Sequence, residues 1–129
     1  MKSMVVASWG LLCKPNLDEG VIYIREKDIQ NEIRMELNDI AVVFRANVGL
    51  YFTRDGRPVN VGLPKGYPDL SGFIKETGKM FFIEVKTATG KLRPEQINFQ
   101  EQMKKYPVIC GVARSGEEAR KLILEGENR

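Results

Sequence analysis

The chain has 129 residues, of which 43% are hydrophobic and 29% charged, a length and composition typical of one compact domain. It contains no histidine, which excludes a Ser/His/Asp or Cys/His triad, a histidine general base and an imidazole metal ligand. Any hydrolytic chemistry must therefore use carboxylates, lysine and a metal bound through oxygen. The net charge of +3 is a weak indication of a polyanionic partner.

The sequence also predicts the compartment. No apolar run approaches the roughly 18 residues of a membrane helix, and the N-terminus lacks the long apolar block of a secretory signal. We therefore expect a cytoplasmic protein that does not bind membranes. Cys13 and Cys110 should then be reduced and packed, not joined in a disulfide.

The first 25 residues are the least interpretable part of the chain. Residues 4–7 and 21–24 have the composition of short strands, whereas residues 9–19 follow neither the helical nor the strand period. No linker or repeat divides the rest, so we treat residues 1–129 as a single domain.

A helix is predicted from Glu26 onward, because apolar residues recur there at spacings of four, four and three. These residues are Ile29, Ile33, Leu37 and Ile40. Residues 41–45 and 48–53 are rich in β-branched and aromatic side chains and predict two strands, and residues 55–58 supply turn chemistry.

The second half of the chain predicts a β-hairpin followed by helix, strand and helix. Residues 69–75 and 80–87 indicate two strands that close on Thr77-Gly78. Pro94 suits the first position of a helix over residues 94–105, and residues 108–112 indicate a buried strand. Ser115, with Glu118 three residues later, forms a capping-box pattern that begins a final helix. The order predicts an α/β domain with a mixed central sheet flanked by helices.

Charged residues interrupt the strand over residues 80–87. Because side chains alternate between faces, Phe82, Glu84 and Lys86 share one side, opposite a wholly apolar side that belongs to the core. Burying an unpaired charge on a strand hydrophobic enough to be central costs folding free energy, which suggests that these charged residues have a function.

Metal-assisted phosphodiester hydrolysis would be such a function. A carboxylate can hold Mg²⁺ while a nearby ammonium group orients or deprotonates the attacking water. Asp69 begins the preceding strand, so cross-strand pairing would bring a second carboxylate within reach of the cation held by Glu84. The plain alternative is an edge-strand pair, Glu84 and Lys86, with Asp69 as a turn residue. The conjunction of Pro68-Asp69, fourteen intervening residues and Glu84-Val85-Lys86 favours function.

These residues resemble the PD-(D/E)XK nuclease superfamily and, more closely, the virus-type replication-repair nuclease (VRR-NUC) family. Short sequence blocks similar to those of the family occur between Glu26 and Ser115, in the same order as in the family. Each block alone is weak evidence, but together they are specific. They are Glu26–Gln30, Arg45–Gly49, Gly66–Leu70, Ile83–Thr87, Gly90–Leu92, Glu95-Gln96 and Gly111–Ser115. The resemblance implies a restriction-endonuclease-like core and a DNA endonuclease that depends on Mg²⁺ or Mn²⁺.

The resemblance also implies roles for individual residues. Asp69 and Glu84 would bind the metal, Lys86 would assist the nucleophilic water, and Gln96 on the following helix would complete the site. A first-helix glutamate is a further catalytic and metal-binding residue, and we place it at Glu26, which opens the buried face of that helix. Glu32 and Glu36 are its rivals, although a solvated helix surface is the simpler interpretation of both.

Basic residues flank the predicted site. Between residues 41 and 68 there are four of them, Arg45, Arg54, Arg57 and Lys65, against one acidic residue, Asp55. The predicted DNA contacts are Arg45, Asn47, Lys65, Gly66, Lys91 and Arg114. Gly66 is explained either by a turn or by close approach of a phosphate to the backbone. No base-reading module is recognisable, so recognition of DNA shape is expected.

Family resemblance adds that small stand-alone members, as found in phages, are homodimers that cut branched DNA such as Holliday junctions. Two alternatives remain open: a nicking nuclease or exonuclease without branch preference, and a DNA-binding module that has lost catalysis.

Overall fold

The computed structural model describes residues 24–46, 50–60 and 62–128. The elements in chain order are α2 (Glu26–Leu37), β1 (Ala41–Arg45), β2 (Leu50–Phe52), β3 (Pro58–Asn60), β4 (Leu70–Ile74), β5 (Met80–Val85), α3 (Pro94–Met103), β6 (Ile109–Ala113) and α4 (Gly116–Glu127). Residues 4–7, 21–23 and Cys13 lie outside the described residues, and Ile24 belongs to no regular element. No described helix has the length and apolar character needed to cross a membrane.

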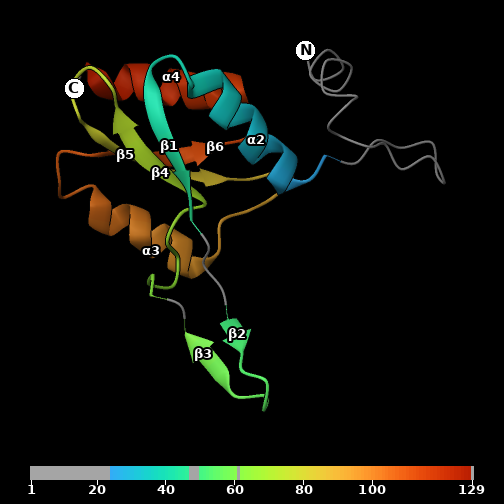
Figure 1. Cartoon of the computed structure of the whole chain (residues 1–129). Coiled ribbons are helices and arrows are strands. Elements are labelled where there is room, and N and C mark those ends of the chain that lie inside the picture. Colours follow the sequence, from blue (N-terminus) through green and yellow to red (C-terminus); the bar gives the residue numbers. More distant parts are fainter. Residues whose placement is uncertain (1–23, 47–49, 61, 129) are drawn as a thin grey trace.

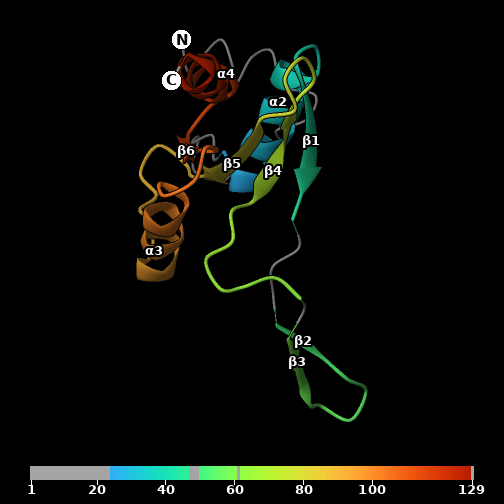
Figure 2. The same ribbon diagram turned by 90° about the vertical axis from the view of Figure 1, so that its left-hand side faces the viewer.

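The predicted mixed central sheet is confirmed. Its strand order is β1-β4-β5-β6, with antiparallel pairing from β1 to β5 and parallel pairing between β5 and β6. Strands β2 and β3 pair only with each other, and Figures 1 and 2 show them apart from the four-stranded sheet. Helices α2 and α4 cover one face of that sheet, and α3 lies on the other.

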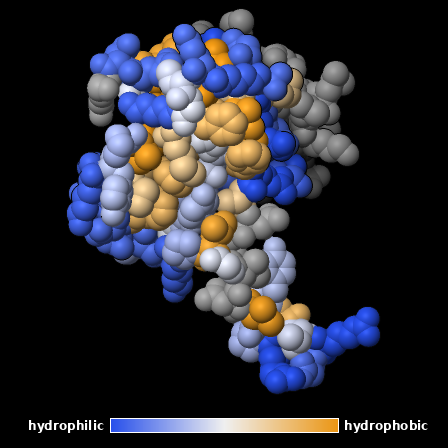
Figure 3. Space-filling model, turned by 60° about the vertical axis from the view of Figure 1, so that its left-hand side comes forward, coloured by the Kyte–Doolittle hydropathy of each residue, from blue (hydrophilic) through white to orange (hydrophobic). Residues whose placement is uncertain are grey.

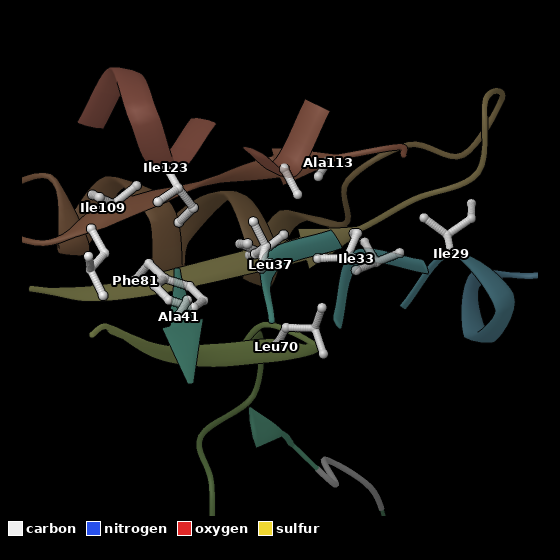
Figure 4. Close-up of a cluster of buried hydrophobic side chains, with 13 residues drawn as sticks. Ile29, Ile33, Leu37, Ala41, Leu70, Phe81, Ile109, Ala113 and Ile123 are labelled. Atoms are coloured by element: carbon white, nitrogen blue, oxygen red, sulfur yellow. The ribbon is translucent and has the colours of Figure 1, made fainter. Parts of the chain in front are cut away.

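The core lies between the sheet and the helices α2 and α4. The predicted apolar stripe of α2 is buried there, with Ile33 and Leu37 fully inaccessible, and the inward side chains of β5 meet it (Figure 4). The apolar pattern predicted a helix as far as Ile40, but α2 ends at Leu37, about one turn earlier. Ile40 lies in the turn that leads into β1, where its backbone N–H donates to the Leu37 carbonyl at 3.0 Å.

Strands β4 and β5 form the predicted hairpin, with Leu70 opposite Ile83 and Phe73 opposite Met80. The prediction of charged residues on a central strand is also confirmed, because β5 lies between β4 and β6. The alternative of an exposed edge strand is therefore wrong.

The second face of the sheet is only partly covered. Helix α3 packs over the β5 and β6 side, where Phe99 contacts Phe82. On the β1 and β4 side, Phe44, Phe73 and Met80 are exposed, and the pairing of the strands places all three on this face. Figure 3 shows apolar atoms gathered on one side of the body of the molecule.

The predicted cap of the last helix is confirmed in one of its two halves. The Ser115 hydroxyl accepts a hydrogen bond from the Glu118 backbone at 3.1 Å. The Glu118 carboxylate in turn accepts from the Arg114 backbone at 3.1 Å, one residue before the position that a capping box uses.

Candidate active site

Asp69 and Glu84 face each other across two paired strands. The β4–β5 register puts Leu70 opposite Ile83, so the next pair outward is Asp69 and Glu84. Two hydrogen bonds fix Asp69 in place. Its Oδ2 accepts from the Val85 backbone at 2.9 Å, and its carbonyl accepts from the Ala46 backbone at 2.9 Å. Asp69 is thereby tied to β5 on one side and to the end of β1 on the other.

Glu84 is a buried carboxylate with an unsatisfied oxygen. Its exposed fraction is 2%, and among the described atoms its Oε1 has no hydrogen-bond partner. The other oxygen, Oε2, lies 4.0 Å from the Lys86 Nζ, too far for a strong hydrogen bond. A buried charge is normally satisfied by hydrogen bonds or by a metal, so the surroundings of Glu84 suit a metal ligand.

The surroundings of Glu84 strongly disfavour its ionisation when no cation is bound. Burial, followed by hydrogen bonding to Asp69 and repulsion from its charge, raises the pKa of Glu84 from 4.5 to about 9. Lys86 opposes this shift, and Glu26 adds to it. A divalent cation bound between the two carboxylates would reverse the balance, because it favours their ionised forms.

The donor set fits a hard cation. Carboxylate oxygens are the ligands that Mg²⁺ prefers, and this ion usually takes only one or two of them from the protein. Within residues 24–46, 50–60 and 62–128, no three acidic or thiol side chains gather closely enough to form a complete cage. Asp69 and Glu84 supply the one or two protein carboxylates that such an ion usually takes.

Lys86 lies on the same face as Glu84 and is 6% exposed. The loop after it packs against its aliphatic chain, since a Cβ atom added at Gly90 would lie 3.4 Å from the Lys86 Cδ. This loop is held by Arg114, whose Nη1 donates to the carbonyls of Thr87 at 2.5 Å and Gly90 at 2.7 Å. Arg114 thus organises the loop that confines Lys86, and its expected contact with DNA stays a prediction.

An aromatic cluster supports the segment before Asp69. The rings of Tyr67, Phe82 and Phe99 meet edge to face, with centroids 5.3–5.8 Å apart. The Tyr67 hydroxyl donates to the Ser71 Oγ at 3.1 Å. The sequence analysis missed this cluster, although Tyr67 stands inside the Gly66–Leu70 block.

Gly66 is required by backbone packing. Its φ is 86°, and an added Cβ atom would lie only 2.2 Å from the Glu95 carbonyl oxygen. The turn that we predicted as one explanation is therefore confirmed. The close approach that the structure shows is to the first turn of α3, and approach of a phosphate stays a prediction. The positive φ and the Glu95 contact account for the glycine without a ligand.

Gln96 is buried at the start of α3 with an exposed fraction of 5%. Its Oε1 accepts a hydrogen bond from the Arg93 backbone at 2.8 Å, which caps the helix. The alternative of an exposed surface residue is therefore wrong. The role of Gln96 in completing the site remains a prediction.

The three glutamates of α2 have different neighbours. Glu26 is half-buried at the first position of the helix, close enough to Glu84 to raise its pKa. Glu32 accepts a hydrogen bond from the Gly116 backbone at the start of α4. Glu36 lies 3.9 Å from Arg120. Glu32 is thus occupied at the contact with α4 and is not solvated as we expected. Glu36 is exposed, as expected, and lies beside Arg120. Of the three, Glu26 alone is linked to the site.

The remaining predicted DNA contacts are mostly at the surface. Arg45, Lys65 and Lys91 are exposed, and Asn47 lies outside the described residues. A groove between α2 and the start of β1, lined by Met35, Asn38 and Val42, lies at the opposite end of β1 from Asp69. The candidate site is therefore separate from this groove.

The family model of the VRR-NUC domain matches residues 26–117. This chain belongs to the VRR-NUC domain family. Ten solved chains match the structure, and one of them, described as "VRR_NUC domain", has a TM-score of 0.55 and 24% sequence identity. That match covers 77% of this chain and 94% of the other, and at this identity it shows the fold alone. No curated protein matched.

Membership of the VRR-NUC family confirms the resemblance inferred from the motifs. It implies a function of the nuclease type with DNA as the substrate. The matched span runs from Glu26 to Glu117 and includes Asp69, Glu84 and Lys86.

Proposed function

We propose that this VRR-NUC domain is a DNA endonuclease that depends on Mg²⁺ or Mn²⁺ and hydrolyses phosphodiester bonds with Asp69, Glu84 and Lys86. The observation that supports this most directly is the buried Glu84 carboxylate opposite Asp69: its Oε1 has no partner among the described atoms, and its Oε2 lies 4.0 Å from the Lys86 ammonium. No structural role explains a carboxylate held at this cost.

In this proposal Asp69 and Glu84 hold the cation. When bound, the cation would supply charge neutralisation at the phosphate and would acidify water. The Val85 N–H bond to the Oδ2 of Asp69 fixes the direction of that carboxylate, and the core beneath β5 fixes Glu84. The loop packs against the Lys86 side chain, and Lys86 would assist the attacking water with its conformational freedom already reduced. Glu26 contributes negative charge from the start of α2.

The test is cleavage of a panel of labelled linear and branched DNAs with Mg²⁺, Mn²⁺ or chelator. We expect cleavage with either metal and none with chelator. Asp69→Ala and Lys86→Ala should each abolish cleavage and keep the fold and much of the DNA binding. The matched controls are Glu76→Ala and Lys121→Ala, which remove exposed charges far from the site along the sheet and on α4 and should retain full activity. Wild-type activity in Asp69→Ala or Lys86→Ala would reject the assignment.

We further propose that the enzyme acts as a homodimer on branched DNA. The open part of the sheet face, formed by Phe44, Phe73 and Met80, supports self-association, since apolar patches of this kind usually mark interfaces. Two sites related by symmetry would cut a four-way junction in paired positions. Sedimentation of the free protein and mapping of cuts on a labelled junction test this. Single cuts by a monomer would favour a nicking nuclease, cuts from DNA ends an exonuclease, and binding without any cut an inactive module.

A further inference from the structure

The β2–β3 ribbon carries exposed aromatic rings outside the core. Every described side chain from residue 51 to residue 59 is exposed, including Tyr51 at 51% and Phe52 at 65%. Isolated two-stranded hairpins are marginal in water, and nothing in the four-stranded sheet pairs with this one. Two large rings on such a ribbon need a purpose other than stability.

Each face of the ribbon holds one ring. Tyr51 pairs with Val59, and Phe52 pairs with Pro58, so neighbouring pairs point to opposite sides. The ribbon thus presents an aromatic and an apolar side chain on each face. In Figure 3 apolar and strongly hydrophilic atoms lie side by side on it.

The chain connectivity ties this ribbon to the candidate active site. It is inserted between β1 and β4, and both ends of the insertion are anchored beside Asp69 and Gln96. On one side Ala46 donates to the Asp69 carbonyl, and on the other Gly66 packs on the Glu95 carbonyl next to Gln96. Phe52 is six positions after Ala46, a reach of at most about 20 Å. A DNA helical turn is about 34 Å long, so DNA bound at Asp69 lies within range of the ribbon.

Charge on the ribbon and its flanks favours a nucleic acid as the partner. Arg54 and Arg57 stand at the turn with one acidic residue, Asp55, which pairs with Arg57 at 2.8 Å. Lys65, on the returning stem, is also exposed. Basic groups that hold phosphates, combined with rings that accept base faces, are the usual means of binding unpaired strands. Strands of three residues offer far less area than the roughly 800 Å² per partner of a stable protein interface.

We propose that Tyr51 and Phe52 stack on unpaired bases at a DNA branch point and so direct cleavage to branched substrates. This inference rests on DNA being the substrate in the proposed function, and it assigns the branch preference to the ribbon. Stacking would occur on bases that a continuous duplex keeps paired. The rings should therefore matter for branched DNA and little for linear duplex.

The experiment compares wild-type protein with Tyr51→Ala, Phe52→Ala and the double variant, using a four-way junction and a linear duplex of equal length. Binding is measured in chelator, so that it does not depend on cleavage, and kcat/KM is measured in Mg²⁺. We expect each substitution to weaken junction binding by about tenfold, from the usual strength of base stacking, and duplex binding by less than about twofold. The ring-preserving variants Tyr51→Phe and Phe52→Tyr should behave as wild type. Tyr106→Ala, which removes a ring of 59% exposure elsewhere, should change neither affinity.

A second readout needs no variant. A splayed-arm DNA with 2-aminopurine in the unpaired arm beside the branch should lose fluorescence when it binds the wild-type protein, because the probe is quenched by stacking on a ring. Equal affinity of the double variant for the junction, equal losses on junction and duplex, or no quenching would each overturn the inference. A change in oligomeric state in the double variant would assign the rings to a second copy of the chain instead. Ring-dependent junction binding by a wild-type protein that cuts no DNA would refute the proposed function and the direction of cleavage, and it would leave only the stacking of Tyr51 and Phe52 on branch-point bases standing.

Discussion

Replacing Glu84 by glutamine should stabilise the metal-free protein while removing its activity. The pKa of Glu84 is raised from 4.5 to about 9 by burial and by Asp69, so the folded state keeps this carboxyl protonated at neutral pH. The unfolded chain ionises it freely. Because the folded state binds the extra proton, the contribution of Glu84 to stability is present below pH 4.5 and is lost progressively as pH rises toward 9.

The size of the effect follows from the same shift. A pH of 7 is about 2.5 units above the ordinary pKa of the carboxyl, which applies in the unfolded chain. At about 1.4 kcal/mol per unit, ionisation in the unfolded chain favours unfolding by about 3 kcal/mol. Glutamine has nearly the same shape as glutamic acid and does not ionise when the chain unfolds. Glu84→Gln should therefore be more stable than wild type by about 3 kcal/mol at pH 7 and by less than about 1 kcal/mol at pH 5.

The assay is denaturant unfolding in chelator at pH 5, 7 and 9, with Glu36→Gln as the exposed control. The control should show no pH-dependent gain, because the Glu36 carboxylate is 44% exposed. Mg²⁺ should raise the stability of wild type and leave Glu84→Gln unchanged. Equal stability of wild type and Glu84→Gln at every pH, or a less stable variant at pH 7, would refute the reasoning.

Three further predictions concern positioning and packing. Gly66→Ala should cost roughly 1–3 kcal/mol of stability in urea unfolding, because its positive φ and the contact with Glu95 exclude a Cβ atom; an unchanged midpoint would contradict this. Arg114→Ala should lower kcat with little change in the salt dependence of DNA binding, whereas a reduced salt slope would assign Arg114 to phosphate contact instead. Arg120→Met should raise the pKa of Asp39, which the Arg120 hydrogen bond holds below its ordinary value; an NMR titration with no change would count against that ion pair.

The sequence predicted the parts of the fold that depend on local patterns. The β4–β5 hairpin followed from two apolar runs closing on Thr77-Gly78, and its register then placed Asp69 opposite Glu84. The burial of Glu84 could also be expected, since the strand around it is rich in apolar residues and one of its sides is wholly apolar. The core of the site was therefore readable from spacing and alternation alone.

Features that depend on distant contacts were not readable. The periodicity of α2 singled out Glu26, but it carries no information on the partners that α4 provides for Glu32 and Glu36. The hydrogen bond from Arg114 to the Gly90 carbonyl joins residues that are 24 positions apart and that follow two parallel strands. The helix also ended earlier than its pattern, because Ile40 turns into β1 and still reaches the core.

The central claim is that Asp69 and Glu84 share one divalent cation. Calorimetric titration of the metal-free protein with Mn²⁺ at pH 7 tests it directly. We expect wild type to bind one Mn²⁺ per chain with release of a proton, since Glu84 must ionise on binding. Lys86→Ala should keep this binding, and Asp69→Asn and Glu84→Gln should each weaken it by at least about tenfold, or roughly 1.4 kcal/mol. Unchanged Mn²⁺ affinity in Asp69→Asn and Glu84→Gln would contradict the claim.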